Sequence, residues 1–206
     1  MALKNTDVEN NFVSILADGK LHKNSTQENK DAIKREYETS DGLKGEKWEL
    51  IYTELTGIIT EVKFYEGNYG KLIQLVFLDG EEEITLSVNV NTSFGEDIMK
   101  KIPAIDLKLP VKIVPYSFED EKDKKRRGVT FYQNEKKVAN FYYDPETKKN
   151  KNGYPDPKVK KGGKISNEEW KIYFMEVRLF LIEDIKKRFN IVEKKEIELE
   201  DLIKNF

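Results

Sequence analysis

Residues 83–90 alternate between polar and apolar side chains, and this alternation constrains the fold of the chain more than its composition does. A period of two residues is typical of a β-strand with one face buried and the other in contact with water. We therefore expect a strand of a one-sided sheet here. Its apolar face holds Ile84, Leu86, Val88 and Val90, and its polar face holds Thr85, Ser87 and Asn89.

The segments around this strand extend the pattern. Two β-rich runs, residues 57–65 and 71–78, come before it and are separated by a hairpin-type loop at residues 66–70. A short helix at residues 94–102 follows, with Ser93 as the capping candidate and Pro103 as its end. Two more strands, residues 111–118 and 128–133, are joined by a charged loop at residues 119–127.

Three strands, a short helix and two strands are the order of an OB-fold, a small barrel that binds single-stranded nucleic acid or sugars. We therefore expect a mainly β protein with added helices, built on a five- to six-stranded OB-fold barrel. The domain prediction is an N-terminal extension (1–47), an OB-fold nucleic-acid-binding domain (48–154), a linker or long loop (155–165), and a C-terminal helix with an acidic tail (166–206).

The C-terminal helix is predicted from its start signal and its apolar spacing. Ser166 followed by Glu169 is typical of a capping box. Apolar residues then recur every three or four positions from Trp170 to Ile185, which predicts an amphipathic helix of about 24 residues. We expect it to pack on the barrel or on its copy in a dimer, and we expect Phe174 and Met175 to be core residues.

The N-terminal extension is charged and is predicted to wrap the barrel rather than to be disordered. Its His22 is the only histidine of the chain. With no cysteine and no second histidine near it, His22 is predicted to be a surface residue with no metal-binding or catalytic role.

The cysteine content and the lengths of the apolar runs indicate the cellular compartment of the protein. The 206 residues include no cysteine, so disulfides and thiolate metal sites are excluded. No apolar run approaches the ~20 residues that a membrane helix needs, and the N-terminus does not read as a secretory signal. We expect a cytoplasmic protein that does not interact with membranes, in a bacterial host if a phage encodes it.

Charge is distributed unevenly along the chain. The net charge is only -2, yet residues 122–164 hold 14 basic and 5 acidic residues. Aromatic residues are interleaved with these cations, a combination suited to stacking on bases and neutralising phosphates. Because neighbours on a strand face opposite sides, we expect one member of each aromatic pair to face a ligand. Tyr132 and Tyr142 are the predicted stacking platforms.

Catalytic motifs are missing from the sequence. It contains no glycine-rich phosphate loop with lysine, no metal-ligand cluster and no serine–histidine arrangement. We therefore predict a non-enzymatic protein without a metal or a cofactor.

Several turn and packing motifs resemble those of the OB-fold single-stranded DNA-binding proteins of tailed bacteriophages. They are the 65–71 hairpin Tyr-Glu-Gly-Asn-Tyr-Gly-Lys, Phe94-Gly95-Glu96, residues 100–107, and Pro110-Val111 with Val114-Pro115-Tyr116 and the basic loop. The resemblance covers about residues 55–154. It implies a sequence-tolerant binder of single-stranded DNA that protects the strand in replication or recombination.

The predicted nucleic-acid-binding residues form two walls and a polar floor. They are Lys63, Tyr65, Tyr69, Lys71, Gln74, Thr85, Ser87, Asn89, Lys124, Lys125, Arg126, Arg127, Tyr132, Lys136, Lys137 and Tyr142. In the tail, Glu200, Asp201 and Phe206 resemble the acidic ends with which such proteins recruit replication or recombination proteins. Two alternatives stay open: an RNA-binding OB protein, and a protein-interaction or assembly module.

Overall fold

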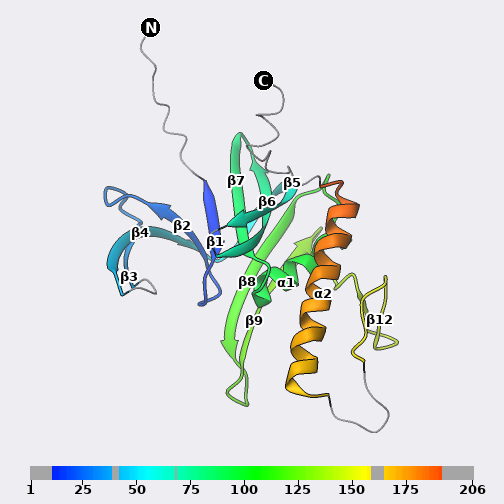
Figure 1. Ribbon diagram of the computed structural model, residues 1–206. Helices are drawn as coiled ribbons and strands as arrows, with labels where there is room; N and C mark the ends of the chain where they lie inside the picture. The colour runs from blue at the N-terminus through cyan, green and yellow to red at the C-terminus, as the bar shows by residue number, and fades with distance from the viewer. Residues whose placement is uncertain (1–10, 39–41, 68, 159–164, 192–206) are drawn as a thin grey trace, which may run out of the picture.

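The computed structural model describes residues 11–38, 42–67, 69–158 and 165–191. In these residues most strands join one sheet of ten, in the order β10-β9-β8-β5-β6-β7-β1-β2-β4-β3 (Figure 1). The strands are β1 (Phe12–Ile15), β2 (Leu21–Ser25), β3 (Ile33–Glu38), β4 (Lys44–Tyr52), β5 (Leu55–Gly67), β6 (Gly70–Asp79), β7 (Glu82–Asn89), β8 (Val111–Glu119), β9 (Lys125–Gln133) and β10 (Lys136–Lys137), with β11 (Tyr143–Asp144) and β12 (Lys149–Asn150) forming a separate pair. The helices are α1 (Ser93–Lys101), a 3₁₀ turn (Ile102–Ala104) and α2 (Asn167–Arg188).

The protein is mainly β with two α-helices, as the sequence indicated. The five expected strands of residues 57–133 are β5 to β9, and the expected short helix between the third and fourth of them is α1. The capping residue of α1 is Thr92 rather than Ser93, because the Thr92 side chain accepts a hydrogen bond from the Gly95 N–H at 3.1 Å.

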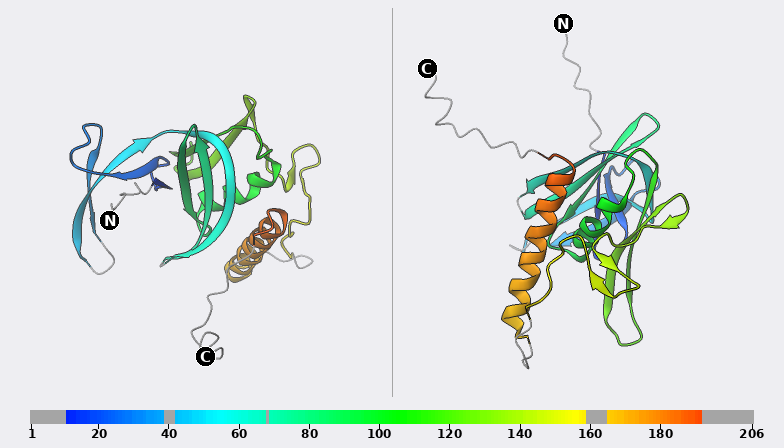
Figure 2. Two further views of the ribbon diagram at one scale, coloured as in Figure 1. Left: turned by 90° about the horizontal axis from the view of Figure 1, so that it is seen from above. Right: turned by 90° about the vertical axis from the view of Figure 1, so that its right-hand side faces the viewer.

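β5 makes the sheet fold over on itself. Its first residues, Leu55–Gly57, pair with β8, whereas residues from Ile58 onward pair with β6. A β-bulge between Ile59 and Glu61 follows shortly after this change of partner, within the part paired with β6, and bulges bend the strand that carries them. The resulting curvature is visible in the left view of Figure 2.

The expected closed barrel is not found, because other groups occupy the two edges that would meet. The free edge of β7 pairs in parallel with β1, residues Phe12–Ser14 lying opposite Thr85–Ser87. At β9, the Val129 N–H donates to Asp97 Oδ2 at 2.9 Å and the Lys101 ammonium donates to the Val129 carbonyl, so two side chains of α1 replace a neighbouring strand. The sheet therefore stays open.

The N-terminal region adds strands to this sheet instead of wrapping it. β1 to β4 are antiparallel neighbours beyond β7, and the predicted boundary at residue 47 falls inside β4. The β1–β2 turn at Gly19 touches β8: a Cβ added there would lie 2.3 Å from the Ser117 nitrogen, and φ is +74°. Only glycine suits both conditions.

The core lies on the inner face of the curved sheet, under α1 and α2. Ile98, Met99 and Ile102 of α1 and the following turn are fully buried, as expected for a helix that covers one end of a barrel. On α2, the capping box at Ser166 is present and Leu181 and Ile185 pack into the core. No helix of the described residues is long and apolar enough to cross a membrane.

α2 buries the predicted stripe at Val177, Leu181 and Ile185, but its outer side carries apolar residues as well. Met175 is 54% exposed and Phe174 is 46% exposed, whereas both were expected in the core. Ile172 and Leu179 are exposed as well. Charged and apolar side chains are mixed on this side of the helix, and among the described residues only the loop around Pro157, Lys158 and Ile165 lies beside it, next to Ile172.

Candidate nucleic-acid interface

The outer face of β5, β6 and β7 brings together six of the predicted binding residues. Residues paired in register across a sheet point to the same side, and here the central row is Lys63, Gln74 and Ser87. The rows beside it are Tyr65–Leu72–Asn89 and Glu61–Val76–Thr85. The core residues Ile73, Leu75 and Phe77 alternate with these on β6 and point inward. The predicted polar floor is thus one continuous surface, which we call the outer face.

Hydrogen bonds tie the side chains of the outer face to one another. The Gln74 amide donates to Ser87 Oγ at 3.3 Å, and the Lys63 ammonium donates to Glu61 at 2.8 Å. The Asn89 amide donates to the Tyr69 carbonyl at 2.9 Å, which fixes the β5–β6 turn against β7. The rings beyond these polar groups are open to solvent.

Two tyrosine side chains of this surface are exposed to solvent, whereas Lys71 lies at its margin. The Tyr65 side chain is 57% exposed and Tyr69, in the β5–β6 turn, is 90% exposed. Lys71 falls on the core side of β6 by alternation, and its ammonium lies 3.7 Å from Glu66. Tyr65 and Tyr69 therefore belong to the outer face, and Lys71 lies at its margin.

The four predicted cations of the β8–β9 hairpin do not share one face. Lys125 and Arg127 alternate with Arg126, and Lys124 lies in the turn. Asp120 organises this turn: the backbone N–H groups of Lys124 and Lys122 donate to its carboxylate, as does Arg126 at 2.8 Å, and these bonds lower the pKa of Asp120. The hairpin presents positive charge on both of its sides.

Tyr132, Lys136 and Lys137 lie at the opposite edge of the sheet from the outer face. β8 and β5 separate their strands from β6. The Lys112 ammonium is 5.5 Å from the centre of the Tyr132 ring, and Lys137 pairs with Tyr132 in register. The residues of the predicted groove are therefore divided between two surfaces, one on β5–β7 and one on β8–β10.

The prediction for Tyr142 is wrong. Its side chain is fully buried, packs against Tyr154 and Phe180, and donates a hydrogen bond from its hydroxyl to Asp184 at 2.6 Å. Burial, and then Asp184, raise the pKa of this tyrosine. Strand alternation does not apply to it, because residues 138–142 are not a strand.

The outer face continues onto β1, β2, β4 and β3, which the sequence reading missed. Ser87 pairs with Ser14, Ser14 with His22, and His22 with Ile51. His22 is 5% exposed rather than a surface residue. The alternation Lys47-Trp48-Glu49-Leu50-Ile51-Tyr52 is the signal that could have identified β4 as a one-sided strand.

A charged cluster around Glu49 lies on this continuation. The Glu49 side chain is 2% exposed and accepts from Arg35 Nε at 2.7 Å and from the Lys47 ammonium. His22 Nδ1 lies 3.1 Å from Glu49, and His22 Nε2 lies 3.1 Å from Asp18. Burial alone raises the pKa of Glu49, but the bonds from Lys47, Arg35 and His22 outweigh it and lower the pKa to about 2.

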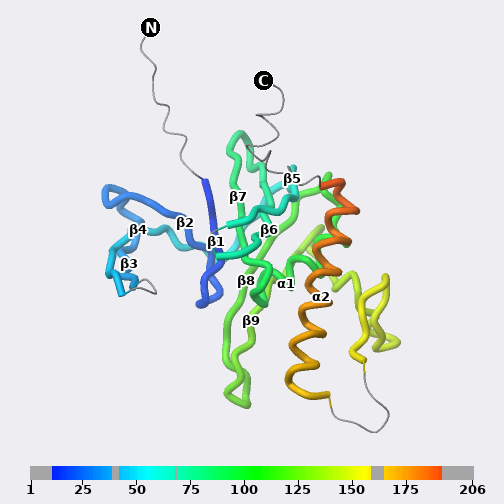
Figure 3. Tube along the Cα trace, viewed as in Figure 1, coloured from blue at the N-terminus to red at the C-terminus, as the bar shows by residue number. Residues whose placement is uncertain are grey.

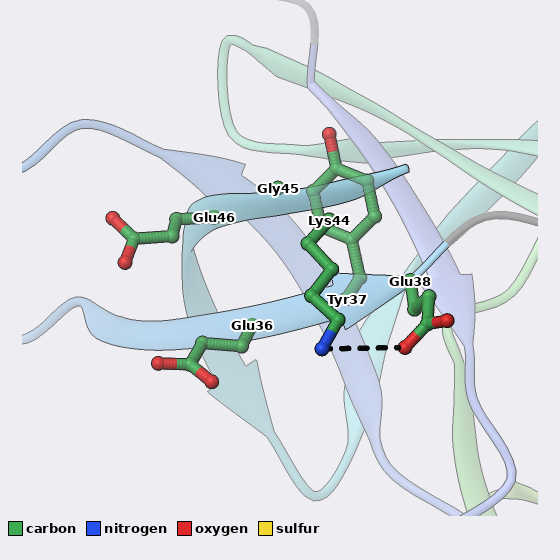
Figure 4. Close-up of a pocket in the computed structure, with 6 residues that line it drawn as sticks. All are labelled: Glu36, Tyr37, Glu38, Lys44, Gly45 and Glu46. Atoms are coloured by element: carbon green, nitrogen blue, oxygen red, sulfur yellow. Dashed lines mark ion pairs between the residues drawn. The ribbon is translucent and has the colours of Figure 1, made fainter. Parts of the chain in front are cut away.

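The tip of the β3–β4 hairpin holds an open hollow of about 640 Å³ (Figure 4). The Tyr37 ring lies over Gly45, where an added Cβ would be 2.5 Å from the ring. Glu36, Glu38 and Glu46 line the hollow, and Lys44 lies 4.0 Å from Glu38. The register of β3 and β4 puts these glutamates on the face of the hairpin opposite Arg35 and Lys47, and three carboxylates around an open space do not suit an anionic ligand on that face.

Two predicted regions fall partly or wholly outside the described residues: the linker at 155–165, of which residues 159–164 are not described, and the C-terminal tail. The tail residues Glu200, Asp201 and Phe206 belong to the region that the structure does not describe. Within the described part of the chain, no group of three or more histidine and acidic residues could hold a metal ion.

Comparisons of the sequence with protein-family models and with curated proteins, and of the structure with solved structures, found no match.

Proposed function

We propose that this protein binds single-stranded DNA, without sequence preference, on the outer face of β5, β6 and β7. We further infer that β5 to β9 with α1 are an OB-fold unit whose barrel is left open. The strand order β9-β8-β5-β6-β7, with a helix between the third and fourth strands in sequence, supports this assignment. In OB-folds the second and third strands, here β6 and β7, carry the nucleic acid.

The observation that carries the proposal is the composition of the outer face. The central row joins a cation, an amide and a hydroxyl, Lys63, Gln74 and Ser87, of which Gln74 is only 8% exposed, and the exposed Tyr65 ring lies in the neighbouring row. Bases of any identity stack on an aromatic ring, while amides and hydroxyls bond to bases and sugars. Such a surface suits an unpaired strand because a duplex hides the faces of its bases.

In this proposal the cations of the β8–β9 hairpin contact the phosphates of the strand. In OB-folds the loop between the fourth and fifth strands contributes to binding, and here that loop is residues 120–124. The cations at and beside it would neutralise phosphates and release counterions. The protein would then protect single strands during replication or recombination, and its acidic tail would recruit partner proteins, as in the phage proteins that the sequence resembles.

Titration of a fluorescent oligonucleotide at several salt concentrations tests the proposal. We expect binding whose affinity falls as salt rises, with a slope of about 0.7 per phosphate contacted. Tyr65→Ala and Tyr69→Ala should each weaken binding by about 1 to 3 kcal/mol. Tyr143→Ala, on the separate β11–β12 pair and 37% exposed, is the matched control. No binding at low salt, or binding that ignores salt, rejects the proposal.

A second candidate function, an assembly module, is favoured by the exposed side of α2. Ile172, Met175 and Leu179 follow one another at spacings of three and four, so they form an apolar stripe on one side of the helix. Its first turn carries Glu168 and Glu169, and its last turn carries Lys186, Lys187 and Arg188. In an antiparallel pair of copies the acidic end of one helix meets the basic end of the other. We therefore propose a second copy of this chain as the partner of the stripe.

A further inference from the structure

The outer face does not end at β7. Pairing in register carries it from Ser87 on β7 to Ser14 on β1, then to His22 on β2, and across β4 to β3. Strands lie about 4.8 Å apart, so the path from β5 to β3 crosses six spacings, or roughly 29 Å. This is about twice the width that remains if the site stops at β1.

The far end of this path carries the same two kinds of side chain as its beginning. Lys47 lies four residues from Ile51 on β4 and therefore on the same, outer side. On β3, Arg35 and Tyr37 lie on this side too, because Arg35 pairs with Lys47 and Tyr37 with Gly45. The Tyr37 ring lies over Gly45 and is 41% exposed. The Arg35 and Lys47 side chains are 40% and 35% exposed. A ring and two cations are therefore accessible together.

The cations of this end reach the solvent although carboxylates lie among them. Arg35 and Lys47 share the Glu49 carboxylate, which is almost completely covered by its partners. Asp18, 3.1 Å from His22 Nε2, is a second carboxylate of the cluster, so a phosphate would meet the exposed parts of Arg35 and Lys47 rather than a net positive charge. Its hydrogen bonds to Glu49 also hold the Arg35 guanidinium in place, which lowers the entropy lost on binding a phosphate.

We propose that a single strand bound on β5–β7 continues over β1–β4, where Arg35 and Lys47 contact its phosphates and Tyr37 stacks on a base. This extension rests on the proposed function. It assigns a binding role to the N-terminal strands, which the sequence presented only as an extension. It also predicts that the length of strand bound is greater than β5–β9 alone could cover.

Affinity measured against oligonucleotide length tests the extension. An oligonucleotide of about 6 nucleotides lies near the lower end of the roughly 4 to 16 nucleotides that an OB-fold covers, and one of about 18 nucleotides exceeds that range. With the longer strand, Arg35→Gln and Lys47→Gln should each weaken binding several-fold and reduce the salt slope by about 0.7. Tyr37→Ala should weaken it by roughly tenfold. With the shorter strand, bound on β5–β7, the three variants should match the original protein.

Lys34→Gln is the matched control for the two charge variants. Lys34 lies next to Arg35 on β3 but on the opposite face, where its ammonium pairs with Glu46 at 2.7 Å. It should leave binding of both lengths unchanged. Unchanged affinity of all three variants for the longer strand, or equal losses with both lengths, would overturn the extension alone. Failure of the original protein to bind either length overturns the proposed function instead.

Discussion

Glu49 shows how one residue joins three strands. Its carboxylate lies on β4 and accepts hydrogen bonds from Arg35 on β3 and Lys47 on its own strand, with His22 of β2 at 3.1 Å. The pKa of Glu49 is lowered to about 2, so the folded state favours the charged carboxylate. Its charge therefore contributes stability above the ordinary glutamate pKa, and this contribution is lost as the pH falls through the pKa of the folded state.

We predict that Glu49→Gln lowers the free energy of unfolding at neutral pH by on the order of 3 kcal/mol, because a pKa difference of one unit corresponds to about 1.4 kcal/mol. Urea unfolding at a series of pH values checks this. The gap between the original protein and the variant should be constant above about pH 5 and should close toward pH 2. Two parallel stability curves across this range would contradict the assignment.

Tyr142 is predicted to act on stability and not on binding. Tyr142→Phe removes the hydroxyl that donates to Asp184 and leaves the ring in the core. A hydrogen bond to a charged group contributes about 1.5 to 3 kcal/mol, so we expect a loss of this size in urea unfolding. DNA affinity at a temperature where the variant is folded should not change. A weakened DNA affinity would contradict this prediction and indicate that Tyr142 contributes to DNA binding.

At the scale of elements, α1 takes the place of a strand at the edge of β9. Asp97 accepts from the Val129 N–H, and Lys101, which is 9% exposed, pairs with Asp97 at 3.0 Å and donates to the Val129 carbonyl. We predict that Asp97→Ala costs about 2 to 4 kcal/mol of unfolding free energy, because it leaves the buried Lys101 ammonium without its carboxylate partner and the Val129 N–H without its acceptor.

Hydrogen exchange distinguishes this edge contact from a general loss of stability. In Asp97→Ala the Val129 amide should exchange faster than its neighbours in the middle of β8 and β9. Glu96→Ala is the control, since Glu96 pairs with Lys100 within α1 rather than with the edge of β9. Equal exchange at Val129 in both variants would show that α1 does not protect the edge.

The elements that the sequence predicted are those whose signals are local. Alternation identified β7, and the Ser166 capping box identified the start of α2. β1 to β3 were missed because they are short or charged, and long-range pairing with β7 and β4 creates them. For the site, alternation placed Thr85, Ser87 and Asn89 on one face, as the pairing with β6 also does, whereas burial of Tyr142 depends on α2, more than 40 residues away along the chain.

At the scale of the whole molecule, the β3–β4 hairpin and α2 carry two different surfaces, one proposed to bind DNA and one apolar. The β3–β4 hairpin, with its cations and Tyr37, lies on the side of the molecule opposite α2 in both views that show them apart (Figures 1 and 2). DNA on the outer face and a second copy on α2 would therefore occupy different sides. The two candidate functions are compatible for this reason, and each can be removed without the other.

The apolar stripe of α2 leads to the last prediction, which concerns self-association. Light scattering should give a mass that rises with concentration toward twice the chain mass of 24.1 kDa. Leu179→Glu should abolish the rise, because it places a charge opposite Ile172 of the other copy, and the 60% exposure of Leu179 makes unfolding an unsuitable explanation. Leu43→Glu makes the same change at a 66% exposed position on the distant hairpin and should leave the dimer intact. A mass of one chain at every concentration would rule out the second copy, and because DNA binding uses another face, Leu179→Glu should still bind oligonucleotides.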